Sequence, residues 1–279
     1  MYFMNMQVNE NTYAINRAFT KQSDGYDSYD ASNTILTWMR QQVRRHVLAH
    51  LKKDARILEL NAGTGLDAVY FVEQGHRVYA TDLSDGMVKQ IQKKITDRKL
   101  EDTLVVQQCS YTELNFIPDK GFDYVFSNFG GLNCIPDLTR VIKHLPPLLK
   151  PGAIVTFVLM PPVCPWEMSK ILKGKWREAF RRFNKKGAPS HLEGEYFPTF
   201  YFTPAQAVKA FGADFKKITL EGLATFSPPP YAEHFPKKYP SIYKLLTWLD
   251  EKTSRLPLCR SYADHFILTM HYQPGSTRN

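Results

Sequence analysis

The residues best suited to chemistry form a glycine-rich stretch, Glu59-Leu60-Asn61-Ala62-Gly63-Thr64-Gly65, which follows a short apolar run. Glycines at such a bend let the backbone pass close to a ligand because they carry no Cβ. The helix-compatible segment after the bend would point free N–H groups at the same ligand. The stretch therefore predicts a site for a nucleotide-type cofactor.

Two kinds of cofactor, a dinucleotide and a sulfonium compound, fit this stretch. Gly63-Thr64-Gly65-Leu66-Asp67-Ala68 matches the G-x-G-x-x-A pattern of dinucleotide-binding loops. Asp82 ends the next predicted strand, where a carboxylate can accept hydrogen bonds from two ribose hydroxyls. The loop alone does not choose between a dinucleotide and a sulfonium cofactor.

Strand-like and helix-like segments alternate along most of the chain. This alternation predicts an α/β fold: a doubly wound, mostly parallel sheet with helices on both faces. The strands are expected at residues 56–60, 76–81, 104–109, 122–127, 153–159, 215–224 and 264–272.

The N-terminal region, residues 1–30, is polar and aromatic and is expected to form a lid. Ser23-Asp24-Gly25 within it predicts a turn. Asn33 predicts the N-cap of an amphipathic helix that runs to Leu51. Arg44 and Arg45 of that helix are interpreted as part of a solvated face.

The alternation is interrupted by an insertion, residues 161–203, which is expected to cap the substrate site. Trp166 to Phe183 predicts one amphipathic helix with aromatic residues on one side and Lys and Arg around the rest. The basic stretch 166–186 suits an anionic membrane surface or RNA phosphates, and a solvated basic face is the third interpretation.

Four segments in register resemble the class I S-adenosylmethionine-dependent methyltransferases. Glu59–Gly65 resembles their E/D-x-G-x-G-x-G motif, and the other three are Tyr79–Ser84, Gly121–Asn128 and Leu149–Ala153. The resemblance covers about residues 30–160. It implies a seven-stranded sheet of order 3-2-1-4-5-7-6 with strand 7 antiparallel, and S-adenosyl-L-methionine as cofactor with S-adenosyl-L-homocysteine as product.

The resemblance also implies which residues contact the cofactor. They are Glu59, Asn61, Ala62, Gly63, Gly65, Asp82, Leu83, Met87, Ser110, Asn128 and Phe129, and Tyr29 either closes over them or packs in the core. Asn61 and Ser110 depart from the family pattern, since Asn61 replaces a glycine and Ser110 stands where an acid is frequent.

The acceptor is less well specified, because methyl transfer needs no fixed catalytic residue. His191 and Tyr201 of the insertion are the candidate catalytic residues. The strand-four region lacks the N/D-P-P-Y/F string of amino-methylating enzymes, which disfavours the exocyclic nitrogen of bases and points to oxygen or carbon of a small molecule. The expected function is methylation of a small or lipophilic acceptor, on O more than on C or N. An RNA methyltransferase, a non-catalytic S-adenosylmethionine-binding protein and a nucleotide-dependent oxidoreductase are the alternatives.

Composition sets the broad limits. The 279 residues, 43% hydrophobic and 23% charged, suit a single domain over residues 1–279. The net charge of +9 favours anionic surfaces in general, although no DNA partner is expected. The four cysteines lack metal-ligand spacing, so no metal is predicted. A cytoplasmic location is expected, because Met1 to Glu10 does not resemble a signal peptide.

Overall fold

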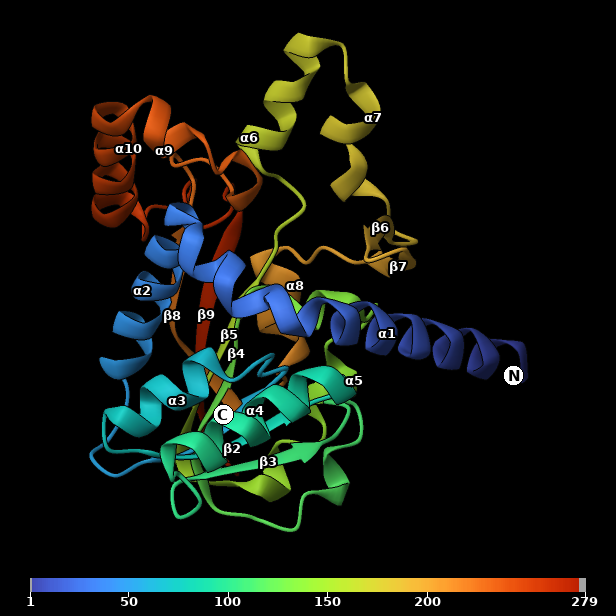
Figure 1. Cartoon of the computed structure of the whole chain (residues 1–279), viewed down its shortest axis with the longest axis vertical. Helices are drawn as coiled ribbons and strands as arrows, with labels where there is room; N and C mark the ends of the chain where they lie inside the picture. The colour runs from blue at the N-terminus through green and yellow to red at the C-terminus, as the bar shows by residue number, and fades with distance from the viewer. Residues whose placement is uncertain (1, 276–279) are drawn as a thin grey trace.

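A seven-stranded sheet forms the centre of the computed structural model, which describes residues 2–275, with side chains from residue 10 onward (Figure 1). The strand order is β3-β2-β1-β4-β5-β9-β8, and β9 pairs antiparallel with both of its neighbours. With β8 and β9 as the sixth and seventh strands, this is the predicted order. The strands are β1 (Arg56–Leu60), β2 (Arg77–Asp82), β3 (Leu104–Gln108), β4 (Phe122–Ser127), β5 (Leu149–Leu159), β8 (Phe215–Leu223) and β9 (His265–Tyr272).

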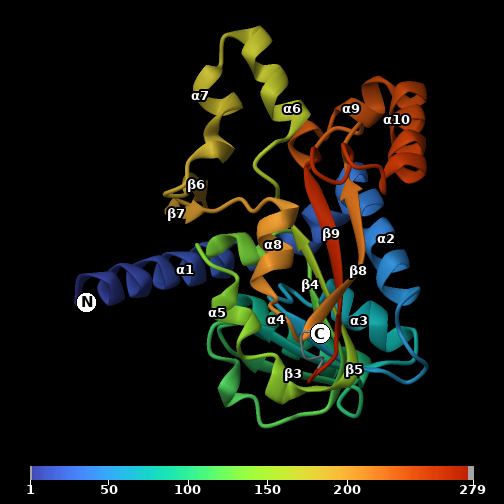
Figure 2. The same cartoon turned by 180° about the vertical axis from the view of Figure 1, so that it is seen from behind.

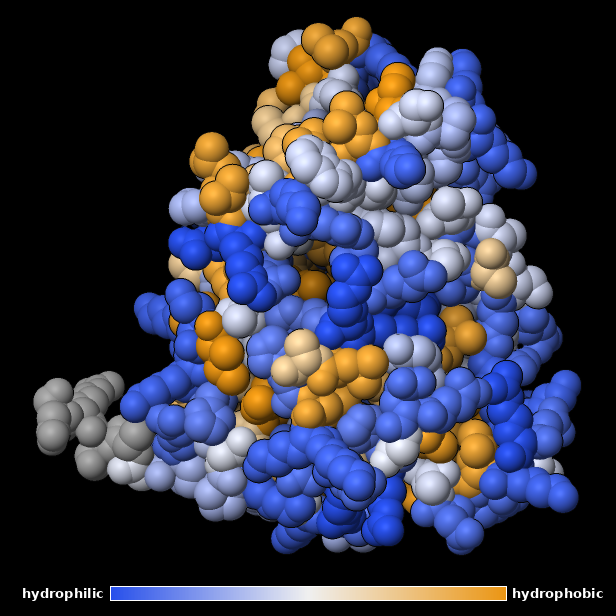
Figure 3. Space-filling model, turned by 90° about the vertical axis from the view of Figure 1, so that its left-hand side faces the viewer, coloured by the Kyte–Doolittle hydropathy of each residue, from blue (hydrophilic) through white to orange (hydrophobic). Residues whose placement is uncertain are grey.

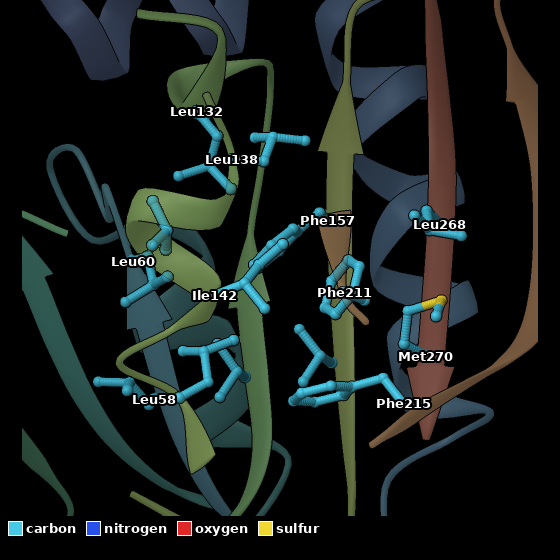
Figure 4. Packing of buried hydrophobic residues seen from close by; sticks show 14 of the residues in the cluster. Leu58, Leu60, Leu132, Leu138, Ile142, Phe157, Phe211, Phe215, Leu268 and Met270 are labelled. Atoms are coloured by element: carbon cyan, nitrogen blue, oxygen red, sulfur yellow. The ribbon is translucent and has the colours of Figure 1, made fainter. Parts of the chain in front are cut away.

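Helices cover both faces of the sheet, as predicted (Figures 1 and 2). Side chains alternate along each strand, so Ile57 and Leu58 of β1 enter two different hydrophobic clusters. Figure 4 shows the Leu58 cluster, which includes Phe157 and Leu268 of the sheet and Ile142. The longer helices are α1 (Tyr2–Ser32), α2 (Thr34–Leu48), α3 (Leu66–Glu73), α4 (Asp85–Arg98), α8 (Pro204–Ala210) and α10 (Pro240–Thr253); α5 (Thr139–Ile142) and α9 (Phe235–Lys238) are single turns.

Side-chain caps begin α2 and α4, among them the predicted cap at Asn33. The Asn33 side chain accepts hydrogen bonds from the amides of Ile35 and Leu36 at the start of α2. Ser84 accepts from the Met87 amide and caps α4. Among the described residues, none of the helices combines the length and apolar character needed to cross a bilayer.

The N-terminal region differs from the prediction. Ser23-Asp24-Gly25 does not form a turn, because α1 continues through it to Ser32. The Ser23 hydroxyl donates to the Thr20 carbonyl (2.8 Å), and this part of α1 packs against α4. A Cβ on Gly86 of α4 would lie 2.8 Å from the Thr20 carbonyl oxygen, so the glycine permits the close packing that keeps α1 helical. Met1 and the side chains of residues 2–9, part of the predicted lid, lie outside the described residues.

The single helix predicted from Trp166 to Phe183 is wrong. The insertion contains four short turns, broken at Gly174, whose φ is +70°. They are α6 (Pro165–Met168), η4 (Ser169–Lys173), α7 (Trp176–Ala179) and η5 (Arg181–Phe183). A two-stranded hairpin, β6 (Ala188–Leu192) and β7 (Glu195–Thr199), follows and leads back to the sheet (Figure 2).

Candidate active site

A cavity of about 440 Å³ lies beyond the carboxyl ends of β1, β2 and β4. This volume falls within the roughly 300–1,000 Å³ of small-molecule sites, and the position is the usual one for ligands of open parallel sheets. Polar residues from the strand ends form one part of the wall: Asn61, Gly63, Asp82, Ser110, Thr112 and Asn128. Apolar residues from α1, the segment after β4 and the hairpin form another: Ile15, Phe19, Phe129, Ile135, Pro198 and Phe200.

The glycine bend holds three residues in the left-handed region. Asn61, Gly63 and Gly65 have φ angles of +45°, +58° and +79°. Gly63 lines the cavity, whereas Ala62 and Gly65 do not. A Cβ on Gly65 would lie 2.9 Å from Ile91 Cγ1, so this glycine allows α3 to begin close against α4.

Asn61 ties the bend to the loop after β4. Its Nδ2 donates to the Asn128 carbonyl (3.1 Å), and the Ser127 hydroxyl donates to its Oδ1 (2.6 Å). The amide lies so close to Gly131 that a Cβ there would overlap it. The residue that departs from the glycine pattern therefore joins the two loops that form the cavity floor.

Asp82 presents a buried carboxylate at the cavity wall. Its Oδ2 accepts from the Gly63 amide and its Oδ1 from the Ser84 amide, both at 2.8 Å. Burial raises its pKa to about 6, although these backbone donors favour the ionised form. Each carboxylate oxygen can accept a further hydrogen bond from a ligand.

Glu59, at the fourth position of β1, is a buried acid with an incomplete set of partners. Burial raises its pKa well above the ordinary value, and the Asp67 carboxylate adds to the effect. Its Oε2 has no hydrogen-bond partner among the described residues. Because buried polar atoms are nearly always paired, Glu59 has unused capacity for a cationic or hydrogen-bonding group.

Asp67 was not among the predicted site residues, yet it is the centre of the surrounding ion-pair network. Arg40 Nη1 donates to its Oδ2 (2.5 Å), Arg44 Nε to its Oδ1 (2.7 Å), and Asn128 Nδ2 to Oδ2 (2.8 Å). Burial opposes ionisation, but the two guanidiniums hold the pKa of Asp67 below its ordinary value. Arg40 also pairs with Asp30 of α1 (2.6 Å). Arg44 is therefore not part of a solvated face, whereas Arg45 is exposed as expected.

The network was not predicted, but the spacing of these arginines is a signal that could have revealed it. Residues four apart lie on the same side of a helix, so Arg40 and Arg44 can converge on one carboxylate. The guanidinium of Arg40 also lies 4.7 Å from the centre of the Phe129 ring. The network thus links α1, α2, α3 and the loop after β4, which is how distant segments are held around one cavity.

Comparisons with known proteins show which proteins the chain resembles. Residues 57–152 match a family described as a methyltransferase domain. A demethylmenaquinone methyltransferase of Listeria monocytogenes serotype 4a is 27% identical over 191 residues, which cover 64% of this chain and 76% of that protein. A Geobacillus kaustophilus protein of the same name is 31% identical over 147 residues, covering 50% and 60%.

Solved structures share the fold. A Listeria monocytogenes structure described as an S-adenosylmethionine-dependent methyltransferase aligns with a TM-score of 0.57 at 17% identity, covering 82% of this chain and 96% of that one. The geranyl diphosphate C-methyltransferase of Streptomyces coelicolor, solved with S-adenosyl-L-homocysteine, aligns with a TM-score of 0.55 at 14% identity, covering 84% and 79%. Together with the methyltransferase-domain match over residues 57–152 and the curated relatives, these likenesses support a class I S-adenosylmethionine-dependent methyltransferase.

The cavity of this methyltransferase contains two groups that suit such a cofactor, the backbone of Gly63, which a ligand can approach closely, and the carboxylate of Asp82. Glu59, whose Oε2 is unpaired among the described residues, was predicted as a cofactor contact but is not among the residues that line the cavity. The cofactor supplies a methyl group already activated on a sulfonium.

Most of the predicted cofactor residues line the cavity of the methyltransferase. They are Asn61, Gly63, Asp82, Leu83, Met87, Ser110, Asn128 and Phe129. Tyr29 does not line it; its hydroxyl accepts a hydrogen bond from Asn33 Nδ2 (3.3 Å) and the side chain is exposed. Tyr26, three residues earlier and so one turn away on the same helix, lines the cavity instead.

Neither candidate catalytic residue of the methyltransferase lines the cavity. His191 is exposed on β6, where its ring packs against that of Tyr196 with 4.5 Å between centroids and 35° between the planes. Tyr201 packs against the Arg182 guanidinium, 5.1 Å from its ring centre. Side chains alternate across the hairpin and the segment after it, so the neighbouring Pro198 and Phe200 face the cavity.

Proposed function

We propose that this methyltransferase methylates a lipophilic, hydroxylated aromatic acceptor of the phenol or quinol type. The main observation that supports this proposal is the apolar part of the cavity wall, formed by Ile15, Phe19, Ile135 and Phe200. Flat aromatic and aliphatic side chains favour an acceptor ring through burial of apolar surface. The relatives named demethylmenaquinone methyltransferase support the same class of acceptor.

The charged lining groups suggest how the acceptor is activated. Asp82 is the only acid among the cavity-lining residues of the described chain, and none of them is a histidine. Arg140 and Lys186 also line the cavity, and neither side chain has an ion pair or hydrogen bond among the described residues. A nearby cation lowers the pKa of a phenolic hydroxyl, so the acceptor would arrive partly ionised without a general base.

The acceptor atom follows from this electrostatic arrangement. A phenolate carries its negative charge mainly on oxygen, and the cations would lie next to that oxygen. O-methylation is therefore the first expectation. The ring carbon beside that oxygen is the second, because the same anion is delocalised onto it. An amine nitrogen is the least favoured acceptor, since two cations at the site would repel a protonated amine.

The cofactor contacts are proposed residue by residue. Asp82 accepts from the ribose hydroxyls, and Glu59 takes the ammonium of the methionine portion. Leu83, Met87 and Ser110 contact the adenine, while Asn128 and Phe129 lie beside the sulfonium. One face of the Phe129 ring is near Arg40, which leaves the other for the cationic sulfur.

The test uses purified protein, labelled S-adenosylmethionine and matched sets of acceptors. Short-chain quinols and phenols should be methylated, and mass spectrometry with NMR should place the methyl group on O or on the adjacent ring carbon. Arg140→Gln and Lys186→Gln should raise the acceptor KM about tenfold and leave cofactor affinity unchanged. Lys185→Gln, an exposed neighbour outside the cavity, is the control. Methylation of amines but not of hydroxylated rings would overturn the proposal.

A further inference from the structure

The outer part of the insertion exposes large apolar side chains. Leu172 is 90% exposed, Trp176 59%, Phe183 47% and Phe180 42%. Single exposed apolar residues are ordinary, but four within twelve positions of one projecting segment are not. Figure 3 shows hydrophobic residues gathered at the upper end of the molecule, the end that carries α6 and α7 in Figure 1.

Basic residues surround these apolar side chains. Lys170 and Lys175 pair with Glu178. Lys173, Arg177, Lys185 and Lys186 are exposed and have no ion pair among the described residues. The segment therefore combines uncompensated positive charge with apolar groups at its outer end.

The insertion is held firmly despite its short, irregular turns. Arg182, buried near its base, donates from Nη2 to Glu167 Oε1 (2.7 Å) and to Asp264 Oδ1 (2.6 Å). Arg181 Nη2 adds a contact to Glu167 Oε1 (2.8 Å). This ionic cluster joins both ends of the turns to the start of β9, so the outer side chains are displayed from a fixed base.

We propose that the outer part of the insertion, residues 168–186, docks this methyltransferase onto an anionic lipid bilayer. Aromatic and leucine side chains enter the interfacial layer, while lysines and arginines contact anionic headgroups. Nucleic acid is the weaker alternative, because the Trp176 and Phe180 rings stack on each other (18° between planes, centroids 6.2 Å apart) and Leu172 offers no stacking surface.

The same segment leads directly to the acceptor site. Lys186 lines the cavity at the end of the turns, and Pro198 and Phe200 line it after the hairpin. A bilayer against the outer turns would lie at the other end of the segment that forms the cavity wall. Docking goes beyond the proposed function, because the proposal does not depend on which acceptor is used. Docking would, however, bring the enzyme close to a lipophilic acceptor in the bilayer.

The test is co-sedimentation of the full chain with vesicles of phosphatidylcholine alone or mixed with phosphatidylglycerol. The protein should bind the anionic vesicles, and binding should weaken as salt is raised. Leu172→Ser with Trp176→Ser should reduce vesicle binding at least tenfold, as should Lys173→Glu with Arg177→Glu. Phe116→Ser, at a 67% exposed aromatic of η1 (Leu114–Phe116), is the matched control and should bind as the wild type does.

Activity separates docking from the proposed function. With a water-soluble quinol the docking variants should keep the wild-type kcat/KM, whereas with a vesicle-borne quinol their KM should rise. Vesicle binding without methylation of any hydroxylated ring would overturn the proposed function and leave docking supported. Docking would be overturned if the protein bound both vesicle types equally or bound neither. It would also be overturned if the variants lost binding to RNA and not to lipid, or if the insertion formed a dimer that does not bind vesicles.

Discussion

Replacing Asp82 by Asn tests the cofactor site most directly. The carboxylate already accepts from the amides of Gly63 and Ser84 and has a raised pKa of about 6. Hydrogen bonds to a charged acceptor contribute about 1.5–3 kcal/mol each, and those to a neutral acceptor about 1 kcal/mol. With two ribose hydroxyls, Asp82→Asn should therefore lose about 2–3 kcal/mol of binding, which is roughly a 30- to 150-fold weaker affinity.

The pH dependence of the same carboxylate gives a second, independent readout. Because the folded protein binds this proton more tightly than the unfolded chain does, the contribution of Asp82 to stability falls as pH rises from about 4 to about 6 and is constant above that. Cofactor binding needs the ionised form, so affinity should fall about tenfold between pH 7 and pH 5. In Asp82→Asn this dependence should be much weaker.

Isothermal titration with S-adenosyl-L-homocysteine from pH 5 to 8 measures both effects. Asp97→Asn, at an exposed acid of α4, is the control for a change of net charge. Glu59→Gln distinguishes the contribution of the buried acid Glu59 to the pH dependence from that of Asp82. Thermal melts establish that each variant is folded. An affinity for Asp82→Asn within twofold of the wild type, together with a flat wild-type profile, would refute the assignment of Asp82 to the site.

Three further predictions concern the groups around the cavity. Glu59→Gln should keep or raise the melting temperature at pH 7, since a buried acid of raised pKa is costly to ionise, and should weaken cofactor binding by calorimetry. Arg40→Ala should cost about 3–5 kcal/mol by leaving buried acids unpaired, lowering the melting temperature by on the order of 10 °C, whereas the exposed Arg45→Ala should change it little. Gly131→Ala should displace the Asn61 amide and weaken cofactor binding, and adding Asn61→Gly should restore it; lack of rescue would contradict the packing argument.

The sheet was predictable because its determinants are local. Glycines at φ above zero, the Asn33 and Ser84 caps and the apolar strands each specify their own segment. The order of strands came from the family resemblance, and the pairing of β9 with β5 and β8 confirms it. The polar wall of the cavity was predictable for the same reason, since its residues follow directly on those strands.

The failures arose where tertiary contacts override local preference. Ser23-Asp24-Gly25 has turn composition, but packing of α1 on α4 keeps it helical. The periodicity from Trp166 to Phe183 favoured one helix. The positive φ of Gly174 and the ion pair between Glu167 and Arg182 instead divide the segment into turns. The hairpin did leave a local signal in Gly194, because the two-residue turn at Glu193 and Gly194 has positive φ at both positions, which a glycine adopts readily.

On the proposed assignment, cofactor and acceptor are specified by different parts of the chain. The cofactor wall is built at strand ends, where the backbone geometry restricts which residues fit. The acceptor wall is contributed by α1, the segment after β4 and the hairpin, which meet only because the Asp30–Arg40–Asp67 network and the Arg182 cluster hold them. Changing Phe19 or Phe200 should alter which acceptors are used without altering cofactor binding, because neither residue belongs to the strand ends. Acceptor preference in this methyltransferase can thus change without disturbing the site that supplies the methyl group.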